Sequence, residues 1–487
     1  MKRLFIFCII GLSLQTIGAA SFFNIKDYGA LGDGKTIDSP AINQAIEAAA
    51  ATGGGTIYFP PGTYLSYSIR LQSNITLWLD NGCTLLAAYP EKTSGYDVAE
   101  ANEFSQYQDF GHSHWKNSLI WGMDLDNITI CGSGQIDGKG LSREESRLPG
   151  VGNKAISLKL CRNVTIKDIT MVHCGHFALL ATGVDNLTLH NVKVDTNRDG
   201  FDIDCCRNVR ISDCSVNSPW DDAIVLKSSY GLGFFRDTEN VTISNCFVSG
   251  FDQGSMIDGT FTTDDLQAPD HAYNTGRIKF GTESSGGFKN ISITNCIFEH
   301  CRGLALETVD GGSLEDVVIN NITMRDIVNS PIFLRLGARM RSPEGTPVGT
   351  MARIRISNVN VYNVDSQYAC IISGIPGHCI EDVSLTNIHI VFKGGGTKED
   401  ALLLPPENEK IYPEPLMFGT IPASGFFIRH ARNIELNQIH IDFLDRDFRP
   451  SLWLEDVQDL SLYNYQAKVE DGVKFAIRKE VENFKME

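Results

Sequence analysis

The chain has 487 residues, a hydrophobic content of 42% and a net charge of −17 at pH 7. This charge argues against a nucleic-acid backbone or an anionic membrane surface as a partner, because both would repel an acidic protein. The length alone would allow two or three domains, and the order of motifs along the chain decides how it is organised.

The first twenty residues have the features of a secretory signal peptide. Lys2 and Arg3 form a charged start, Leu4 to Leu14 is an apolar run, and Gly18-Ala19-Ala20 supplies small residues for cleavage. The run is too short to span a membrane, and no later run is apolar enough. We expect residues 1–20 to direct export to the periplasm or the extracellular space, and we expect a monomer without a membrane partner.

Residues 21–55 are predicted to form an N-terminal cap. A helix is expected from about Pro40 to Ala51, with Asp38 or Ser39 as the N-cap and Gly53 to Gly55 as the stop. Such a helix would cover the open end of a stack of strands, where unpaired backbone groups need protection.

A short segment that begins with Asn recurs at intervals of about 22 to 50 residues. The first and third positions after Asn are apolar, and the fifth is Asp or Asn. Period-two alternation predicts strands, and recurrence predicts a solenoid. We therefore expect an all-β parallel β-helix over residues 56–470, followed by a C-terminal tail over 471–487. The segments in clearest register begin at Asn163, Asn186, Asn208, Asn240 and Asn290.

The sixth position of these segments is Cys214, Cys246 and Cys296 in three coils and Ile169 and Val192 in two others. This exchange favours a ladder of small buried apolar side chains. No CxxC pair with a His partner occurs, so a zinc site is not expected. The sequence predicts neither a metal site nor a cofactor.

Counting thirteen residues past the repeated Asn brings acidic residues of adjacent coils together. The count reaches Asp199 from Asn186 and Asp221 from Asn208, and Asp222 follows directly. Equivalent positions of successive coils lie about 4.8 Å apart, so these carboxylates are expected to share one patch suited to acid/base chemistry on a glycosidic bond. The same count reaches His176 and Gln253, which are candidates for the same groove.

Adjacent residues of a regular strand point to opposite faces, so Asp221 and Asp222 can share a cleft only at a bulge or turn. Pro219 just before them makes such a break plausible. Crowded carboxylates raise one another's pKa, which would let one of them remain protonated as an acid.

The stretch NRDGFDIDCCRNVRISDCSVNSPWDDAIVLKSS resembles the pattern of glycoside hydrolase family 28, which includes polygalacturonases and rhamnogalacturonan hydrolases. The resemblance implies a right-handed parallel β-helix that hydrolyses pectic polysaccharide or oligosaccharide containing galacturonic acid, with inversion. It implies that Asp221 is the general acid and that Asp199 and Asp222 activate water. Asn197 and Lys227, which lie in these two motifs, are assigned to substrate binding.

Two features depart from the family pattern. Where the family has Gly-His-Gly, the repeat register offers Phe251-Asp252-Gln253-Gly254, and the match of GTESSGG to the family instead places the His position near Thr275, with His271 nearby. Where the family has Arg-Ile-Lys, coil order gives Ala305-Leu306-Glu307. Arg277 and Lys279, one coil earlier, are the remaining candidates for binding a uronate, since Arg binds a carboxylate through two parallel hydrogen bonds.

Two other functions fit the same fold. A polysaccharide lyase would use a Lys or Arg base and would produce an unsaturated sugar that absorbs ultraviolet light. A non-catalytic carbohydrate-binding solenoid would show no turnover. The departures from the family motifs favour a specialised linkage, such as one in a branched rhamnogalacturonan, over plain homogalacturonan.

Overall fold

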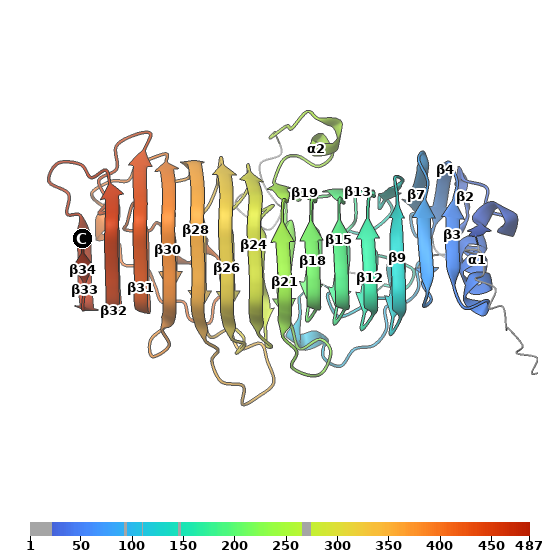
Figure 1. Ribbon diagram of the computed structural model, residues 1–487, viewed down its shortest axis with the longest axis horizontal. Coiled ribbons are helices and arrows are strands. Elements are labelled where there is room, and N and C mark those ends of the chain that lie inside the picture. Colours follow the sequence, from blue (N-terminus) through green and yellow to red (C-terminus); the bar gives the residue numbers. More distant parts are fainter. Residues whose placement is uncertain (1–21, 92–94, 110, 145–147, 265–273) are drawn as a thin grey trace, which may run out of the picture.

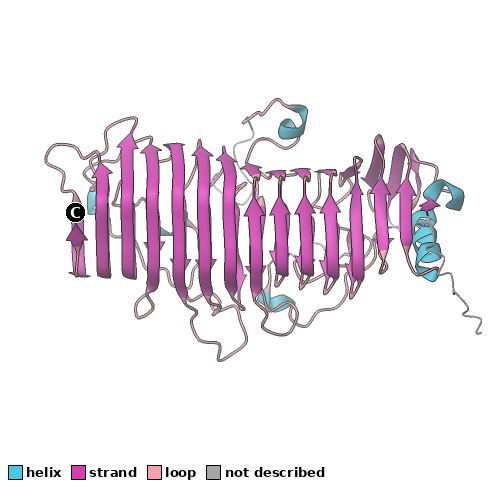
Figure 2. Cartoon of the chain, viewed as in Figure 1, coloured by secondary structure: helices cyan, strands magenta, loops and turns pink. Residues whose placement is uncertain are grey.

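The computed structural model describes residues 22–91, 95–109, 111–144, 148–264 and 274–487. The predicted signal peptide and His271 lie outside the described residues. The molecule is an elongated stack of coils made almost entirely of strands, with helices at one end and in the connecting segments (Figures 1 and 2). The strands pair in parallel from coil to coil, and the predicted right-handed parallel β-helix is confirmed.

The coils wind through three parallel sheets. Sheet 1 contains β1 (Phe22–Asn24), β3 (Gly55–Phe59), β6 (Ile75–Leu79), β9 (Asp126–Gly132), β12 (Arg162–Lys167), β15 (Asp185–His190), β18 (Arg207–Ser212), β21 (Thr238–Ser244), β24 (Phe288–Glu299), β26 (Leu314–Arg325), β28 (Met351–Val364), β30 (Ile380–Phe392), β31 (Phe426–Phe443), β32 (Leu452–Ala467) and β34 (Lys485–Met486). Sheet 2 contains β2 (Asp33–Ile37), β4 (Gly62–Ser66), β7 (Cys83–Ala87), β10 (Gln135–Asp137), β13 (Thr170–Val172), β16 (Lys193–Asp195), β19 (Ser215–Asn217) and β22 (Phe247–Ser249), and it continues into the second half of β24. Sheet 3 contains β5 (Ile69–Arg70), β8 (Ser118–Met123), β11 (Lys154–Lys159), β14 (Phe177–Thr182), β17 (Asp199–Asp204), β20 (Ile224–Ser228), β23 (Ile278–Ser284), β25 (Leu304–Thr308), β27 (Ile332–Leu336), β29 (Cys370–Ser373), the first part of β31 and of β32, and β33 (Ala476–Glu482).

Helix α1 (Ser39–Ala51) lies at the N-terminal end of the stack (Figure 1). It buries Ile42, Ala45, Ile46 and Ala49 against the first coil, and the helix predicted over nearly the same residues is confirmed. Asp38 is the N-cap, but its carboxylate accepts hydrogen bonds from the backbone N–H groups of Leu31 and Gly32 instead of capping the helix. It thereby ties the cap to the preceding loop.

The repeated Asn residues form a continuous hydrogen-bonded ladder along the outside of sheet 1. Each side-chain amide donates to the side-chain oxygen of the Asn one coil earlier, at 2.7 to 3.2 Å. Each of these residues has a positive φ between 55° and 63°, a left-handed conformation that Asn tolerates better than most residues. The ladder runs through Asn74, Asn127, Asn163, Asn186, Asn208, Asn240 and Asn290.

Apolar side chains at the alternate positions fill the interior of the coils. Cys214, Cys246 and Cys296 are free thiols in the same buried column as Ile169 and Val192, which confirms the predicted ladder of small buried side chains. Burying a side chain of this kind stabilises the fold by roughly 1.5–3 kcal/mol for the larger aliphatic members, so the stack is held mainly by its core.

Sheets 3 and 1 continue to the C-terminal end, where β33 and β34, respectively, pair in parallel with β32. These two strands lie within residues 471–487, and the proposed division of the chain at residues 55 and 470 stays a prediction. None of the helices among the described residues combines the length and the apolar composition needed to cross a membrane.

Candidate active site

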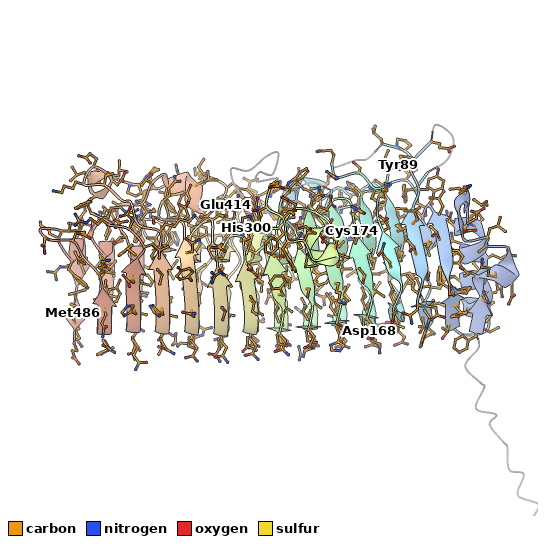
Figure 3. The ribbon with its side chains drawn as sticks, turned by 90° about the horizontal axis from the view of Figure 1, so that it is seen from above. Tyr89, Asp168, Cys174, His300, Glu414 and Met486 are labelled. Atoms are coloured by element: carbon orange, nitrogen blue, oxygen red, sulfur yellow. The ribbon has the colours of Figure 1, made fainter. Side chains whose placement is uncertain are left out.

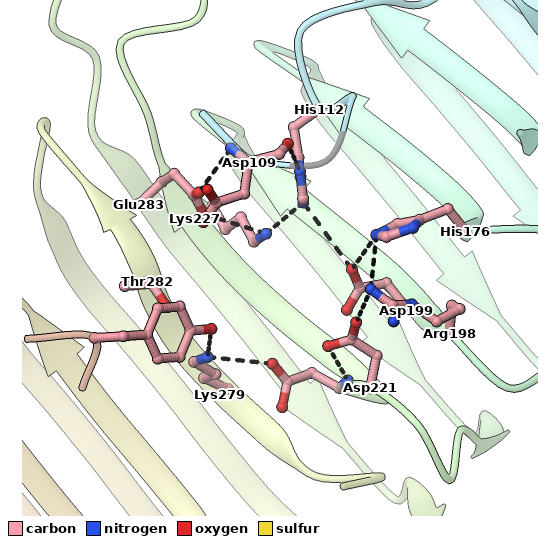
Figure 4. A pocket seen from close by; sticks show the side chains of 12 residues that line it. Asp109, His112, His176, Arg198, Asp199, Asp221, Lys227, Lys279, Thr282 and Glu283 are labelled. Atoms are coloured by element: carbon pink, nitrogen blue, oxygen red, sulfur yellow. Dashed lines mark hydrogen bonds and ion pairs between the residues drawn. The ribbon is translucent and has the colours of Figure 1, made fainter. Parts of the chain in front are cut away.

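A cavity of about 210 Å³ lies over strands β14, β17, β20 and β23 of sheet 3, near the middle of the stack. Figure 4 shows that its side chains converge from these strands and from loops that cross above them. The lining residues are Asp109, His112, His176, Arg198, Asp199, Asp221, Asp222, Lys227, Lys279, Thr282, Glu283 and Tyr412.

Two segments distant in sequence reach the cavity from outside the coils. The segment between β7 and β8, which includes the 3₁₀ helix η2 (Ser105–Tyr107), supplies Asp109 and His112. The segment between β30 and β31, which includes η3 (Asp400–Leu402) and η4 (Pro415–Phe418), supplies Tyr412. The cavity is therefore walled by loops and is not an open groove along the sheet.

The three aspartates singled out from the sequence all line this cavity. The strand register places Phe201 opposite Ile224, so Asp199 is level with Asp222 and not with Asp221. Asp221 and Asp222 lie in the turn between β19 and β20, as the sequence predicted for two adjacent residues facing one cleft. The count from the repeated Asn differs by one residue because this turn is longer than the one before it.

Asp199 and Asp221 lie together on one side of the cavity, with carboxylate oxygens within 4.8 Å of each other and of His176 Nε2. Burial, and next the neighbouring Asp221 charge, raise the pKa of Asp199 well above its usual range. Arg198 Nη2 lies 3.1 Å from Asp221 Oδ2. Burial and the repulsion between the two carboxylates therefore favour retention of one proton by the pair, and Arg198 stabilises the negative charge that remains.

His176 is a buried neutral group on the same side of the cavity. Its Nδ1 donates to the backbone oxygen of Arg143 at 3.0 Å, and its Nε2 faces Arg198 Nη2 at 3.5 Å. Burial, followed by the Arg198 charge, lowers the pKa of His176 well below its usual value. A neutral imidazole adds no positive charge, so Arg198 is the cation that faces the aspartate pair from this side.

Asp222 has the opposite environment on the other side of the cavity. Arg277 Nε donates to Asp222 Oδ1 at 2.9 Å, and Lys279 Nζ lies 3.4 Å from Asp222 Oδ2. Burial alone would raise the pKa of Asp222, but the Lys279 and Arg277 charges outweigh burial and hold it below its usual value. Asp222 is therefore ionised under conditions in which the Asp199–Asp221 pair holds a proton.

A third cluster connects the upper loops to the floor of the cavity. Lys227 lies 3.2 Å from both Asp202 and Glu283, and it donates to His112 Nε2. Burial would raise the pKa of Glu283, but Lys227 and other cations hold it well below its usual range. Because His112 Nδ1 donates to the backbone oxygen of Asp109, this cluster fixes the loop that carries both residues.

Two groups of side chains have the spacing to hold a metal ion, namely His112, Asp199 and Asp202, and His176, Asp199 and Asp221. A protein cation already lies within each group. Lys227 contacts His112 and Asp202 in the first, and Arg198 contacts His176 and Asp221 in the second. A divalent cation at either place would meet this positive charge, so the geometry favours acid/base chemistry by the carboxylates themselves.

Some of the residues predicted to bind substrate line the cavity and others do not. Lys227, Lys279 and His176 line it. Arg277 is 2% exposed and lies behind Asp222, where it is also paired with Glu414, so it supports the aspartate and does not line the cavity.

Asn197 and Gln253 are not among the residues that line the cavity. Asn197 is buried next to Arg198. Gln253 accepts a hydrogen bond from Arg143 at 3.3 Å and lies in the long segment between β22 and β23 that carries α2 (Ser255–Asp258). This segment lengthens the coil, and the thirteen-residue count therefore does not carry Gln253 into the stack.

The remaining lining residues were missed by the sequence reasoning. Thr282 and Glu283 belong to the GTESSGG stretch, whose resemblance to the family could have signalled them. Asp109, His112 and Tyr412 are carried by the long loops, and no repeat register assigns loop residues to a coil position.

Comparison with known proteins adds independent information. A model described as "Glycosyl hydrolases family 28" matches residues 99–251, and one described as "Rhamnogalacturonase A/epimerase, pectate lyase-like" matches residues 22–173. A probable polygalacturonase from Vitis vinifera is 26% identical over 373 residues, which cover 70% of this chain and 74% of that protein. An exo-poly-alpha-D-galacturonosidase from Dickeya chrysanthemi is 28% identical over 395 residues, which cover 73% of this chain and 64% of that protein. This chain thus spans slightly less than two thirds of the Dickeya protein.

The solved structure of a family 28 exopolygalacturonase from Yersinia enterocolitica is similar in fold, with a TM-score of 0.65 at 18% sequence identity. The superposition covers 96% of this chain and 78% of that chain. An exopolygalacturonase structure from Thermotoga maritima gives a TM-score of 0.63 at 18% identity, covering 87% of this chain and 92% of that chain.

Proposed function

We propose that the chain is a member of glycosyl hydrolase family 28 and that it hydrolyses a glycosidic bond in pectic polysaccharide or oligosaccharide containing galacturonic acid. One observation carries the proposal. Asp199, Asp221 and Asp222 come from adjacent coils and turn into one cavity, where two form a proton-holding pair and the third is held ionised. Glycoside hydrolysis needs one carboxylic acid and one carboxylate on either side of the bond.

The acid function belongs to the Asp199–Asp221 pair. Two carboxylates this close share protons as a unit, and their titration belongs to the pair. The Asp221 side chain is 17% exposed, whereas that of Asp199 is 5% exposed. Asp221 therefore delivers the proton to the leaving oxygen, and Asp199 keeps that proton available.

The base function belongs to Asp222. Its charge is stabilised by Arg277 and Lys279, so it remains a carboxylate that can take a proton from water. Water activated in this way attacks the anomeric carbon from the face opposite the leaving group and inverts its configuration. Proton magnetic resonance of the first product anomer tests this, and a first product that retains the anomeric configuration would refute it.

The size and the walls of the cavity favour action at a chain end. Its volume of about 210 Å³ lies below the ~300–1,000 Å³ of common ligand pockets. The loops that carry His112 and Tyr412 limit its length. We expect small products released from the first minutes of digestion, and a ladder of intermediate lengths would contradict this expectation. Export through residues 1–20 remains part of the proposal.

The first experiment is digestion of a panel of pectic polysaccharides and oligosaccharides by the wild type, Asp221→Asn and the exposed control Asp213→Asn. New reducing ends and the ultraviolet absorbance of an unsaturated uronate are followed together. New reducing ends without absorbance, lost in Asp221→Asn and kept in Asp213→Asn, are the expected result. Absorbance would instead indicate a lyase, and equal activity in Asp221→Asn would refute the proposed acid.

A further inference from the structure

The cations that line the cavity are already paired with protein carboxylates. Among the described residues, the Lys and Arg side chains of the lining are Arg198, Lys227 and Lys279. Arg198 lies 3.1 Å from Asp221, Lys227 lies 3.2 Å from Asp202 and Glu283, and Lys279 lies 3.4 Å from Asp222. A substrate carboxylate would have to compete with one of these pairs.

Arg277, a cation behind the lining, is neutralised by a residue from a distant loop. Glu414, in the segment between β30 and β31, bonds Arg277 and accepts from Arg302 Nη1 at 2.9 Å. Burial would raise the pKa of Glu414, but Arg277 and Arg302 lower it to about 2, so the side chain is charged. Arg277 is therefore shared between Asp222 and Glu414, with no donor face turned to the cavity.

The next coil supplies no cation that could bind a substrate carboxylate in place of Arg277. In the register of sheet 3, Lys279 pairs with Ala305 on β25. The family resemblance places an Arg-Ile-Lys substrate grip at residues 305–307, but Ala305 is packed in a buried apolar cluster with Phe333. Burial raises the pKa of Glu307 to about 8, so this side chain is an uncharged acid at neutral pH. The three positions that would grip a uronate, residues 305–307, therefore carry no positive charge.

We propose that the sugar unit bound against Lys279 and Tyr412 is neutral, a hexose or deoxyhexose without a carboxylate, and that Glu414 is a specificity-determining residue that excludes a uronate there. This inference rests on the proposed hydrolase function. A uronate at this place would meet Asp222 without a spare cation, and like charges brought together at a binding site disfavour the wrong ligand. Tyr412, 43% exposed, offers an aromatic ring against which the C–H face of a neutral sugar can pack.

The test uses two oligosaccharides that differ only in the terminal unit. One carries a galacturonic acid residue, and the other carries the same residue with its carboxylate reduced to a primary alcohol. We expect the wild type to hydrolyse the reduced substrate with a kcat/KM at least about tenfold higher, the scale expected for like-charge exclusion. Equal or greater activity on the uronate substrate would overturn the inference and leave the proposed hydrolase intact.

Binding supplies the same comparison without turnover. Asp199→Asn removes one member of the acid pair, and it keeps the nearest partners of Arg198, Lys227 and Lys279, because none of these partners is Asp199. Calorimetry with this variant should show tighter binding of the reduced oligosaccharide. If neither substrate is hydrolysed, the proposed function fails, and this binding comparison still decides the question of charge.

Glu414→Gln tests the residue itself. Losing this charge leaves the positive charge of Arg277 and Arg302 less neutralised behind the cavity wall, which lowers the electrostatic cost of a substrate carboxylate without direct contact. The ratio of kcat/KM for uronate to neutral substrate should therefore rise by about tenfold or more. Glu399→Gln, an exposed change on the same loop, is the control and should leave the ratio unchanged. A folded Glu414→Gln with an unaltered ratio would contradict the role given to Glu414.

Discussion

Asn and Asp residues recur on successive coils at two places in this molecule. At one place they form a structural ladder, and at the other they form the candidate active site. In the ladder along sheet 1, each Asn meets another Asn, is at least partly exposed to solvent and hydrogen-bonds its equivalent on the neighbouring coil. In the cavity over sheet 3, Asp199, Asp221 and Asp222 are mostly buried and meet Arg, Lys and His. Figure 3 shows Asp168, of a second such ladder, along one edge of the stack and Glu414 on the opposite side.

The difference indicates how to separate structural from functional polar residues in a solenoid. A residue that hydrogen-bonds its own equivalent on each neighbouring coil adds the same small amount to the stability of the fold at every coil. A residue that meets unlike neighbours breaks the repeat and has no role in propagating it. Glu307 illustrates the second case, because the residue nearest to its carboxyl group is the unlike Lys279, at 3.7 Å. Neither of its buried carboxyl oxygens has a hydrogen-bond partner, and such an arrangement lowers the stability of the fold.

The sharpest test of the comparison is to exchange a carboxylate in each region for its amide. Asp222→Asn should lower kcat/KM by about 10³-fold or more, because the base is lost and general acid–base groups contribute on the order of 10²–10⁴. Its melting temperature should stay within a few degrees of the wild type. Kinetics on the pectic substrate and thermal unfolding are the measurements.

Asp213→Asn, in the second exposed ladder, is the matched control. It should leave kcat/KM unchanged, since Asp213 is exposed and neither of its contacts, Asn245 of the next coil and His190 of the preceding coil, lines the cavity. A large loss of activity in this control, or unchanged activity in Asp222→Asn, would break the distinction between the two regions.

The ladder side of the molecule was readable from the sequence because it repeats. The Asn register, the apolar alternation and the Cys column all have the same period, and the strands were predicted from them. The capping helix was predicted from its own start and stop residues. The grouping of Asp199 with Asp221 and Asp222 was also readable, since residues in nearly equal register must lie close together.

The rest of the site depends on segments that leave the repeat. Glu414 and Arg277 are separated by 137 residues, and Gln108 and Asp204 by 96. No periodicity relates such pairs, and their contacts are set by how the loops fold over the coils. The two positions Thr275 and His112 show the limit of sequence-based prediction. The sequence shows that Thr275 stands where the family has His, but it does not show that another loop brings His112 into the cavity.

The second prediction concerns how the free energy of unfolding depends on pH through the buried Glu307. The pKa of Glu307 rises from 4.5 to about 8 on folding, chiefly because of burial. Between these values the unfolded chain has released the proton and the folded chain still holds it, so stability falls as the pH rises, by at most about 1.4 kcal/mol per pH unit. Glu307→Gln removes this dependence.

Denaturant unfolding between pH 5 and pH 8 measures this effect. The stability of Glu307→Gln relative to wild type should increase with pH over this range. Glu399→Gln should run parallel to the wild type throughout. A constant difference between Glu307→Gln and wild type would mean that Glu307 is already ionised in the folded protein.

A third prediction separates the two sides of the cavity by pH. Lys279→Met removes a cation that lowers the pKa of Asp222, so the acidic limb of the kcat/KM profile should move to higher pH. A shift of about one unit, or about tenfold lower activity on that limb, is expected for a neighbouring charge. Lys289→Met, which removes a half-buried cation paired with Asp237 and Glu239 outside the cavity, should not move the limb. An unmoved limb in Lys279→Met would exclude Asp222 as the titrating base.

The smallest effect belongs to the ladder itself, where two substitutions separate its two contributions. Asn208→Gly keeps the left-handed backbone, φ 56°, and loses only the side-chain bonds to Asn186 and Asn240. An exposed amide hydrogen bond contributes about 0.5–1.5 kcal/mol, and Asn208→Ala should be worse by roughly 1–2 kcal/mol because Ala disfavours this conformation. Both variants should keep full kcat/KM. Equal stabilities of the two variants would show that the repeated Asn is needed for its hydrogen bonds alone, and loss of activity in either would connect the ladder to the cavity.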